Sequence, residues 1–334
     1  MSAQMRRIQS LLKNQTRSIQ IAFNEAISRA STAIDRPTLI RLLEIGDVEA
    51  AAQLFRMDRA VLYPLEKAVQ DAIIASGLSV TPNLPSVISG KFGFDGNHPR
   101  AVEIAQRQAA NLVTYVDQDA VASARKVIAD GIRTNRGLNA VARDLIGRKV
   151  GKRRVGGIIG LTEQQTDRML NLRSMLTDPN RIGEYFNGDL PRYKESDRRM
   201  DGRVRKAIRD GKSLSSKDAN DIAEAYKVKA SGARGRRVAR AEAFTSQALG
   251  RREAYLQVAA RDDVEAVTKT WIHGLSVEPR LDHQDLNGKT IGIDEMFSMG
   301  DGTLMFNPHD PQGGATHSLG CRCTCQYRVK VRKF

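Results

Sequence analysis

Apolar residues recur at helical spacing throughout residues 101–147, and this long run limits the fold more than any other feature of the chain. Side chains three or four residues apart share one face of a helix, so the run predicts long amphipathic helices. Gly131 and Gly137 are expected to divide it into two or three helices. Residues 1–75 show the same spacing, and Pro64 is expected to bend or restart the last helix there.

Two stretches rich in glycine and other helix breakers interrupt this pattern. Residues 76–100 are interpreted as a loop or short extended linker, and a glycine- and arginine-rich stretch occupies residues 147–160. Thr162 is expected to cap a helix that follows it. A further helix is predicted from residues 214–230 onward, and it runs into the C-terminal part of the chain.

The sequence changes in character after about Asp263, where β-branched and aromatic residues alternate with polar ones around Trp271. This alternation predicts a strand. Shorter strands are predicted at residues 289–293 and 302–306, and residues 321–333 alternate like a final strand. The predicted fold class is therefore mainly α, with long helical N-terminal and middle regions and a small C-terminal α+β module.

Length and composition exclude several classes of protein. A chain of 334 residues that is 41% hydrophobic can bury a core, so it is not disordered as a whole. Its length predicts two or three domains, which we place at 1–95 (an N-terminal helical region), 96–234 (a basic helical middle region) and 235–334 (the C-terminal module). The sequence has no membrane-spanning run, no secretory signal, and too few cysteines for a disulfide framework. A reducing cytoplasm is the expected compartment.

Positive charge is concentrated in the middle of the chain. The net charge is +15, and residues 141–260 carry +12 of it, with 27 Lys and Arg against 15 Asp and Glu. Such a basic stretch attracts nucleic-acid phosphates, although a solvated helical face explains any single cluster equally well. Few aromatic residues lie among the cations, which favours sequence-independent phosphate contacts with double-stranded DNA over base stacking. The candidate DNA-binding residues are Arg148, Lys149, Lys152, Arg153, Arg154, Arg198, Arg199, Arg203, Arg205 and Lys206.

Four of the five histidines and all three cysteines lie in the last 62 residues. Zinc binds thiolate sulfur and imidazole nitrogen, and a small module with a sparse core gains most from such a site. The candidate ligands are His283, Cys321 and Cys323, completed by His309, His317 or Cys325. A strand through the Cys-x-Cys-x-Cys sequence would point all three thiols to one face. Alternatively, the cysteines pack as small apolar residues and the histidines bond to loop backbone.

No catalytic residue is predicted. The zinc deaminase signature fails, because Cys-x-Cys stands where that signature requires Cys-x-x-Cys. A cysteine–histidine nucleophile has no accompanying oxyanion-hole motif, and the chain has no Gly-rich phosphate loop. The expected function is therefore not enzymatic.

Several short motifs follow one another along the C-terminal module. Their residues are Trp271, Arg280, Asp282, His283, Gly288, Phe297, Pro308, Asp310, Cys321, Arg322 and Cys323. In this order they resemble the phage Mu protein F-like head morphogenesis family, which includes minor capsid proteins of tailed phages. Upstream, residues 239–242 resemble a helix motif of that family. Glu278, Gly320 and Ala241 depart from the family pattern.

The resemblance implies a phage minor capsid or head morphogenesis protein that associates with the portal protein inside the procapsid. It implies further contacts with major capsid or scaffold proteins and with packaged DNA. Its location would be the virion interior, after assembly in the host cytoplasm. Within the module, Arg280 is expected to form an ion pair with Asp282 or Glu278. Two alternatives stay open: a sequence-nonspecific DNA-binding protein of host origin, and the C-terminal effector enzyme of a modular toxin.

Overall fold

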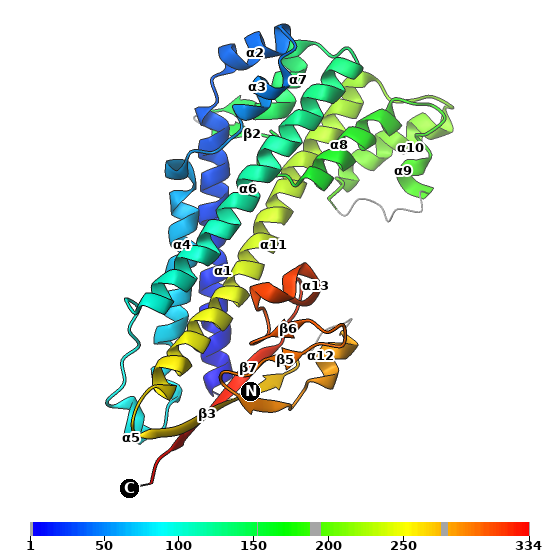
Figure 1. The fold of residues 1–334 in the computed structure, drawn as a ribbon. Coiled ribbons are helices and arrows are strands. Elements are labelled where there is room, and N and C mark those ends of the chain that lie inside the picture. The colour runs from blue at the N-terminus through cyan, green and yellow to red at the C-terminus, as the bar shows by residue number, and fades with distance from the viewer. Residues whose placement is uncertain (1–2, 152, 188–194, 275–279, 334) are drawn as a thin grey trace. The chain divides into compact units, whose positions relative to one another are not determined.

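The computed structural model describes residues 3–151, 153–187, 195–274 and 280–333 (Figure 1). Its α-helices are α1 (Ala3–Ala33), α2 (Arg36–Glu44), α3 (Val48–Gln53), α4 (Arg59–Leu78), α5 (Ser86–Ser89), α6 (Pro99–Arg133), α7 (Leu138–Ile146), α8 (Glu163–Leu176), α9 (Glu184–Asn187), α10 (Asp201–Arg209), α11 (Ser216–Ala259), α12 (Leu281–Asp285) and α13 (Gly314–Ser318). The short 3-10 helices are η1 (Thr81–Asn83), η2 (Arg198–Met200) and η3 (Pro311–Gly313). The strands are β1 (Arg148–Val150), β2 (Arg153–Val155), β3 (Val264–Ile272), β4 (Thr290–Gly292), β5 (Phe297–Ser298), β6 (Leu304–Met305) and β7 (Thr324–Val331). The predicted fold class is confirmed.

The chain forms two compact units, each built from segments that are distant in the sequence. Unit 1 comprises residues 1–20, 65–111 and 238–334, and unit 2 comprises residues 21–64 and 112–237. The long helices α1, α6 and α11 contribute residues to both. The division of the sequence at residues 95 and 234 stays a prediction.

Glycine has opposite roles at two places in the long amphipathic run. α6 continues through Gly131, where the prediction of a break is wrong. A Cβ atom there would lie 2.5 Å from Cγ2 of Val141 in α7, so the glycine permits close packing of the two helices. Gly137 does separate them, because it is the N-cap of α7. Pro64 lies within α4.

The predicted cap of α8 is confirmed. The Thr162 hydroxyl accepts the backbone N–H of Gln165 at 3.1 Å, and the Gln165 side chain accepts the backbone N–H of Thr162 at 3.0 Å. This reciprocal pair satisfies two N–H groups that the helix cannot bond internally. α11 begins in a similar way, since the hydroxyl of Ser215 accepts the backbone N–H of Asp218 at 3.1 Å.

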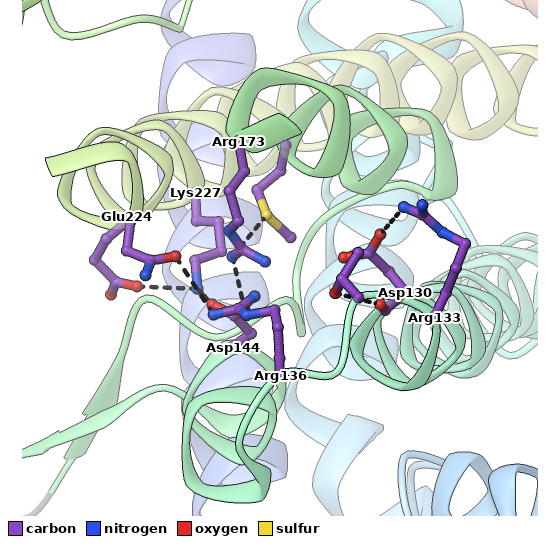
Figure 2. Close-up of polar contacts among 10 residues, drawn as sticks. Asp130, Arg133, Arg136, Asp144, Arg173, Glu224 and Lys227 are labelled. Carbon is purple, nitrogen blue, oxygen red and sulfur yellow. Dashed lines mark hydrogen bonds and ion pairs between the residues drawn. The ribbon is translucent and has the colours of Figure 1, made fainter. Parts of the chain in front are cut away.

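Unit 2 buries a network of charged side chains around Asp144 in α7 (Figure 2). One oxygen of Asp144 accepts Arg136 at 2.5 Å and Arg173 at 2.7 Å, and the other accepts Lys227 at 2.9 Å. Lys227 has no exposed side-chain surface and also pairs with Glu224 at 2.9 Å. A buried charge is costly unless a charge of opposite sign compensates it. The contacts that compensate Asp144 come from α8 and α11, so they hold these two helices against α7.

The C-terminal strands of unit 1 form an antiparallel sheet in the order β4-β3-β7. Trp271 of β3 is fully buried, and Phe297 packs edge-on against it with ring centroids 5.2 Å apart. Tyr255 of α11 stacks on Tyr327 of β7 at 4.2 Å, which fixes the helix against the sheet. β7 begins only at Thr324. Cys321 and Cys323 therefore lie in the loop before the strand, and the prediction that one strand carries all three thiols is wrong.

Among the described residues, no helix combines the length and the apolar character that crossing a membrane requires.

Candidate metal centre

His283 lies in the single-turn helix α12 and is 1% exposed. Its ring meets Trp271 edge-on, with centroids 5.3 Å apart, and stacks on the ring of His317 at 5.5 Å. Gly288, whose φ is +83°, ends the turn after α12, and its N–H bonds to the carbonyl of Trp271 at 2.9 Å. The sheet therefore determines where the imidazole sits.

Two thiols face the same nitrogen of this imidazole. Nδ1 of His283 lies 3.5 Å from Sγ of Cys321 and 3.6 Å from Sγ of Cys323. Sulfur and nitrogen ligands at about 2.3 and 2.0 Å from a tetrahedral zinc ion lie roughly 3.5 Å apart. Both nitrogen–sulfur distances thus match the edges of such a site, and the three side chains form a group that could hold a metal ion.

The two thiols differ in acidity because they interact with each other. The hydrogen bond from the thiol of Cys321 and, to a smaller extent, His283 together lower the pKa of Cys323 to about 4, against the effect of burial. The same hydrogen bond and burial raise the pKa of Cys321. The interaction therefore favours the thiolate at Cys323, and thiolate is the form of cysteine that binds metals.

The second nitrogen of His283 faces a chain of hydrogen-bonding groups. Its Nε2 lies 3.3 Å from Nδ1 of His317, and Nε2 of His317 lies 3.0 Å from a carboxylate oxygen of Asp301. The backbone of Thr303 and then His317 lower the pKa of Asp301 to about 2, so this carboxylate is ionised. Metal-binding histidines usually have such a partner on the other nitrogen, which fixes the ring and its tautomer.

A second group overlaps the first at His283. The side chains of Asp282, His283 and His317 also place ligand atoms within 4.8 Å of one another. Nδ1 of His317 is 3.3 Å from a carboxylate oxygen of Asp282. His317 therefore lies beside the candidate centre, but it is not grouped with the two thiols.

The other two candidate ligands lie outside both groups. His309 is buried, with its ring 4.8 Å from that of Phe244, and burial lowers its pKa to about 4. Cys325 is buried in β7 opposite Trp271, and burial raises the pKa of its thiol to about 12. Among the described residues, the group that contains the two thiols has three members, His283, Cys321 and Cys323.

The remaining motif residues shape the loops around the centre. Arg280 donates to the carbonyl of Leu319 at 2.6 Å and so holds the segment that leads to Cys321. The expected pair of Arg280 with Asp282 is not formed, because Asp282 faces His317 instead. Glu278, the other expected partner, lies outside the described residues.

Asp310 organises the loop between β6 and α13. Its carboxylate accepts the backbone N–H groups of Phe306 at 2.8 Å and Gln312 at 3.0 Å. The carbonyl of Pro308 accepts the side-chain amide of Asn307 at 3.0 Å. Arg322, between the two cysteines of the centre, is exposed.

The candidate DNA-binding residues belong to two parts of unit 2. Arg148, Lys149, Arg153 and Arg154 lie in the β1–β2 hairpin, whereas Arg198, Arg199, Arg203, Arg205 and Lys206 lie in η2 and α10. Arg148 and Arg199 line the same cavity of about 630 Å³, so the structure brings the two sequence clusters together. Lys152 lies outside the described residues.

These cations differ in how far they are neutralised. Arg199 pairs with Asp197 at 2.7 Å, and Arg203 pairs with Asp218 at 3.1 Å. Arg205 lies over the ring of Phe186, and Arg154 donates to the carbonyl of Gly147. Within the described chain, Arg148, Lys149, Arg153, Arg198 and Lys206 are exposed and form no ion pair.

Sequence reasoning did not identify Asp301, which fixes the His317 ring. No sequence signal indicated it, because it lies 16 residues from His317 in a turn outside the family motifs.

Comparison with known proteins adds no relative: no family model, no curated protein and no solved structure matches this chain. The resemblance to the head morphogenesis family therefore depends on the motif residues themselves.

Proposed function

We propose that the chain is a minor capsid or head morphogenesis protein of a tailed phage, acting with the portal protein inside the procapsid. The order of the motif residues from Trp271 to Cys323 carries this proposal. The geometry supports it, because motif residues far apart in the sequence meet in one buried cluster. Nδ1 of His283 faces Cys321 and Cys323, which follow it by 38 and 40 residues, and the ring of Trp271 packs against the His283 ring. A chance succession of short motifs would not require such contacts.

The role proposed for this cluster is structural. His283, Cys321 and Cys323 are 1%, 5% and 3% exposed, which leaves a substrate little access to them. We take the metal to be zinc, because thiolate and imidazole are its preferred ligands, whereas magnesium and calcium prefer oxygen. A bound ion would join α12 to the loop before β7 and stabilise a module with a small core.

DNA is the proposed partner of the β1–β2 hairpin. Arg148, Lys149 and Arg153 are exposed on it without acidic partners among the described residues. Such cations neutralise phosphates and release counterions, a contact that does not depend on base sequence. This suits a protein enclosed with packaged DNA.

Mass spectrometry of gradient-purified virions tests the head-assembly role. We expect the polypeptide at a few copies per particle, and we expect it to persist after nuclease and high-salt washing. Its absence from particles whose other structural proteins are fully represented would contradict the proposal. If the free protein then still bound DNA, that result would favour the host DNA-binding alternative.

Salt titration of duplex binding by the full chain tests the hairpin. Replacing Arg148, Lys149 and Arg153 with Gln should reduce the slope of log K against log salt by about 3, since each phosphate contact contributes about 0.9. The control is a second triple variant, in which Gln replaces Lys67, Arg125 and Lys126. It removes the same amount of positive charge, but from residues that already pair with carboxylates. Equal slopes for the two triple variants would remove the hairpin from the interface.

A further inference from the structure

Two cations of unit 1 lie close to one aromatic ring, and neither cation belongs to the groups of candidate metal ligands. The guanidinium carbon of Arg252 in α11 lies 3.8 Å from the ring centroid of Phe306, and Nζ of Lys269 in β3 lies 5.3 Å from it. Lys269 is fully buried and donates to the carbonyl of Ile293 at 2.9 Å. The ring faces attract both cations but do not neutralise them.

Neither cation has an acidic partner within the part of the chain that is described. No carboxylate there lies within 4.0 Å of Arg252 or Lys269, and both oxygens of nearby Asp310 accept backbone N–H groups. Burial lowers the pKa of Arg252. Burial first, and then the charge of Arg252, lower the pKa of Lys269 to about 8. Asp310 and Asp294 act on both cations at longer range, but no carboxylate of the described residues forms a close ion pair with either one.

Arg252 and Phe306 line a cavity of about 310 Å³ between α6, α11 and the loop after β6. Its volume is at the small end of ligand pockets, which span roughly 300–1,000 Å³. Side-chain amides of Gln108, Asn111 and Gln312 line it as well. The carboxylate of Asp310 is also part of the lining, and each of its oxygens accepts a backbone N–H group. Arg107, the other cation of the lining, already pairs with Glu103 at 3.5 Å.

We propose that this cavity binds a small carboxylate that carries an amide next to the charge, such as an acylated amino acid or the carboxyl end of a peptide. The guanidinium carbon of Arg252 lies over the Phe306 ring, and its Nε is buried with no hydrogen-bond partner among the described residues. The N–H edge of a guanidinium matches a planar carboxylate in two parallel hydrogen bonds. The neutral amides of the lining match an amide of the ligand. Since Arg107 already pairs with Glu103, one guanidinium without a close ion pair faces the cavity, which favours a singly charged group over a phosphate dianion.

Isothermal titration of the full chain with N-acetylalanine tests the proposal. Wild-type protein should bind it, and the uncharged methyl ester should bind at least about tenfold more weakly, as hydrogen bonds to charged groups imply. This comparison uses only the wild-type chain, so it does not depend on how a variant folds. Arg252→Gln should lose binding to a similar extent, and Arg252→Lys should restore part of it.

The matched control is Arg209→Gln, which removes an exposed arginine of unit 2 and should bind like wild type. No binding of N-acetylalanine by wild-type protein, equal binding of the acid and its ester, or unchanged binding by Arg252→Gln would each overturn the proposal. Tighter, Arg252-dependent binding of inorganic phosphate would show that the ligand class is wrong.

Discussion

Replacing Asp144 with Asn should destabilise unit 2 strongly. The substitution keeps the shape of the side chain but removes the negative charge that three cations share. The side chains of Lys227 and Arg173 are 0% and 11% exposed, so water cannot replace the lost carboxylate. Only Glu224 still balances the charge of Lys227. Removing one partner of a buried pair costs about 3–5 kcal/mol, and because Glu224 remains we expect the lower end, about 3 kcal/mol.

Thermal unfolding measures this loss, which at 2–4 °C per kcal/mol corresponds to a fall of roughly 6–12 °C in Tm. The matched control is Asp167→Asn. Its partner Lys126 is 32% exposed and also pairs with Glu163, so the control should lose less than about 1 kcal/mol. A loss below 1 kcal/mol for Asp144→Asn, or equal losses for the two variants, would refute the reasoning.

Two further predictions concern single side chains. Burial raises the pKa of Glu242 to about 7 from 4.5, so the folded chain keeps a proton that the unfolded chain releases between these pH values. The free energy of unfolding should therefore fall as pH rises from about 4.5 to 7, by at most about 3 kcal/mol. Glu242→Gln should flatten this pH profile. Parallel pH profiles of wild type and Glu242→Gln in scanning calorimetry would contradict the prediction. Thr162→Ala removes the cap of α8 and should lower the free energy of unfolding by about 1 kcal/mol, whereas Thr162→Ser should lower it much less. Equal urea midpoints for Thr162→Ala and wild type would show that the cap contributes nothing.

The helices could be predicted where the signal is local. The cap at Thr162 needs only residues three positions apart, and the sequence contains both of them. The predicted helix break at Gly131 is wrong for a reason that is not local. A glycine within a helix lowers its stability by about 1 kcal/mol, and here the packing against Val141, ten residues further on, outweighs that loss. No helix propensity reports that contact.

The candidate metal centre could likewise be predicted only in part. Composition and motif order were enough to nominate His283, Cys321 and Cys323, which the structure brings within ligand distance. The positions of His309, His317 and Cys325 outside this group depend on where the loop after β6 turns and where β7 begins, and neither follows from spacing. For the same reason the sequence could not show that Asp218, fifteen residues away, neutralises Arg203.

Metal content of the purified chain tests the central claim most directly. Plasma mass spectrometry should find about one zinc per chain in wild-type protein and in Cys325→Ser, and much less in Cys321→Ser and His283→Ala. Cys325 is a matched control, because it is a buried cysteine two residues beyond Cys323 that lies outside the ligand group. A wild-type chain that binds no zinc, or four proteins with equal zinc content, would contradict the account.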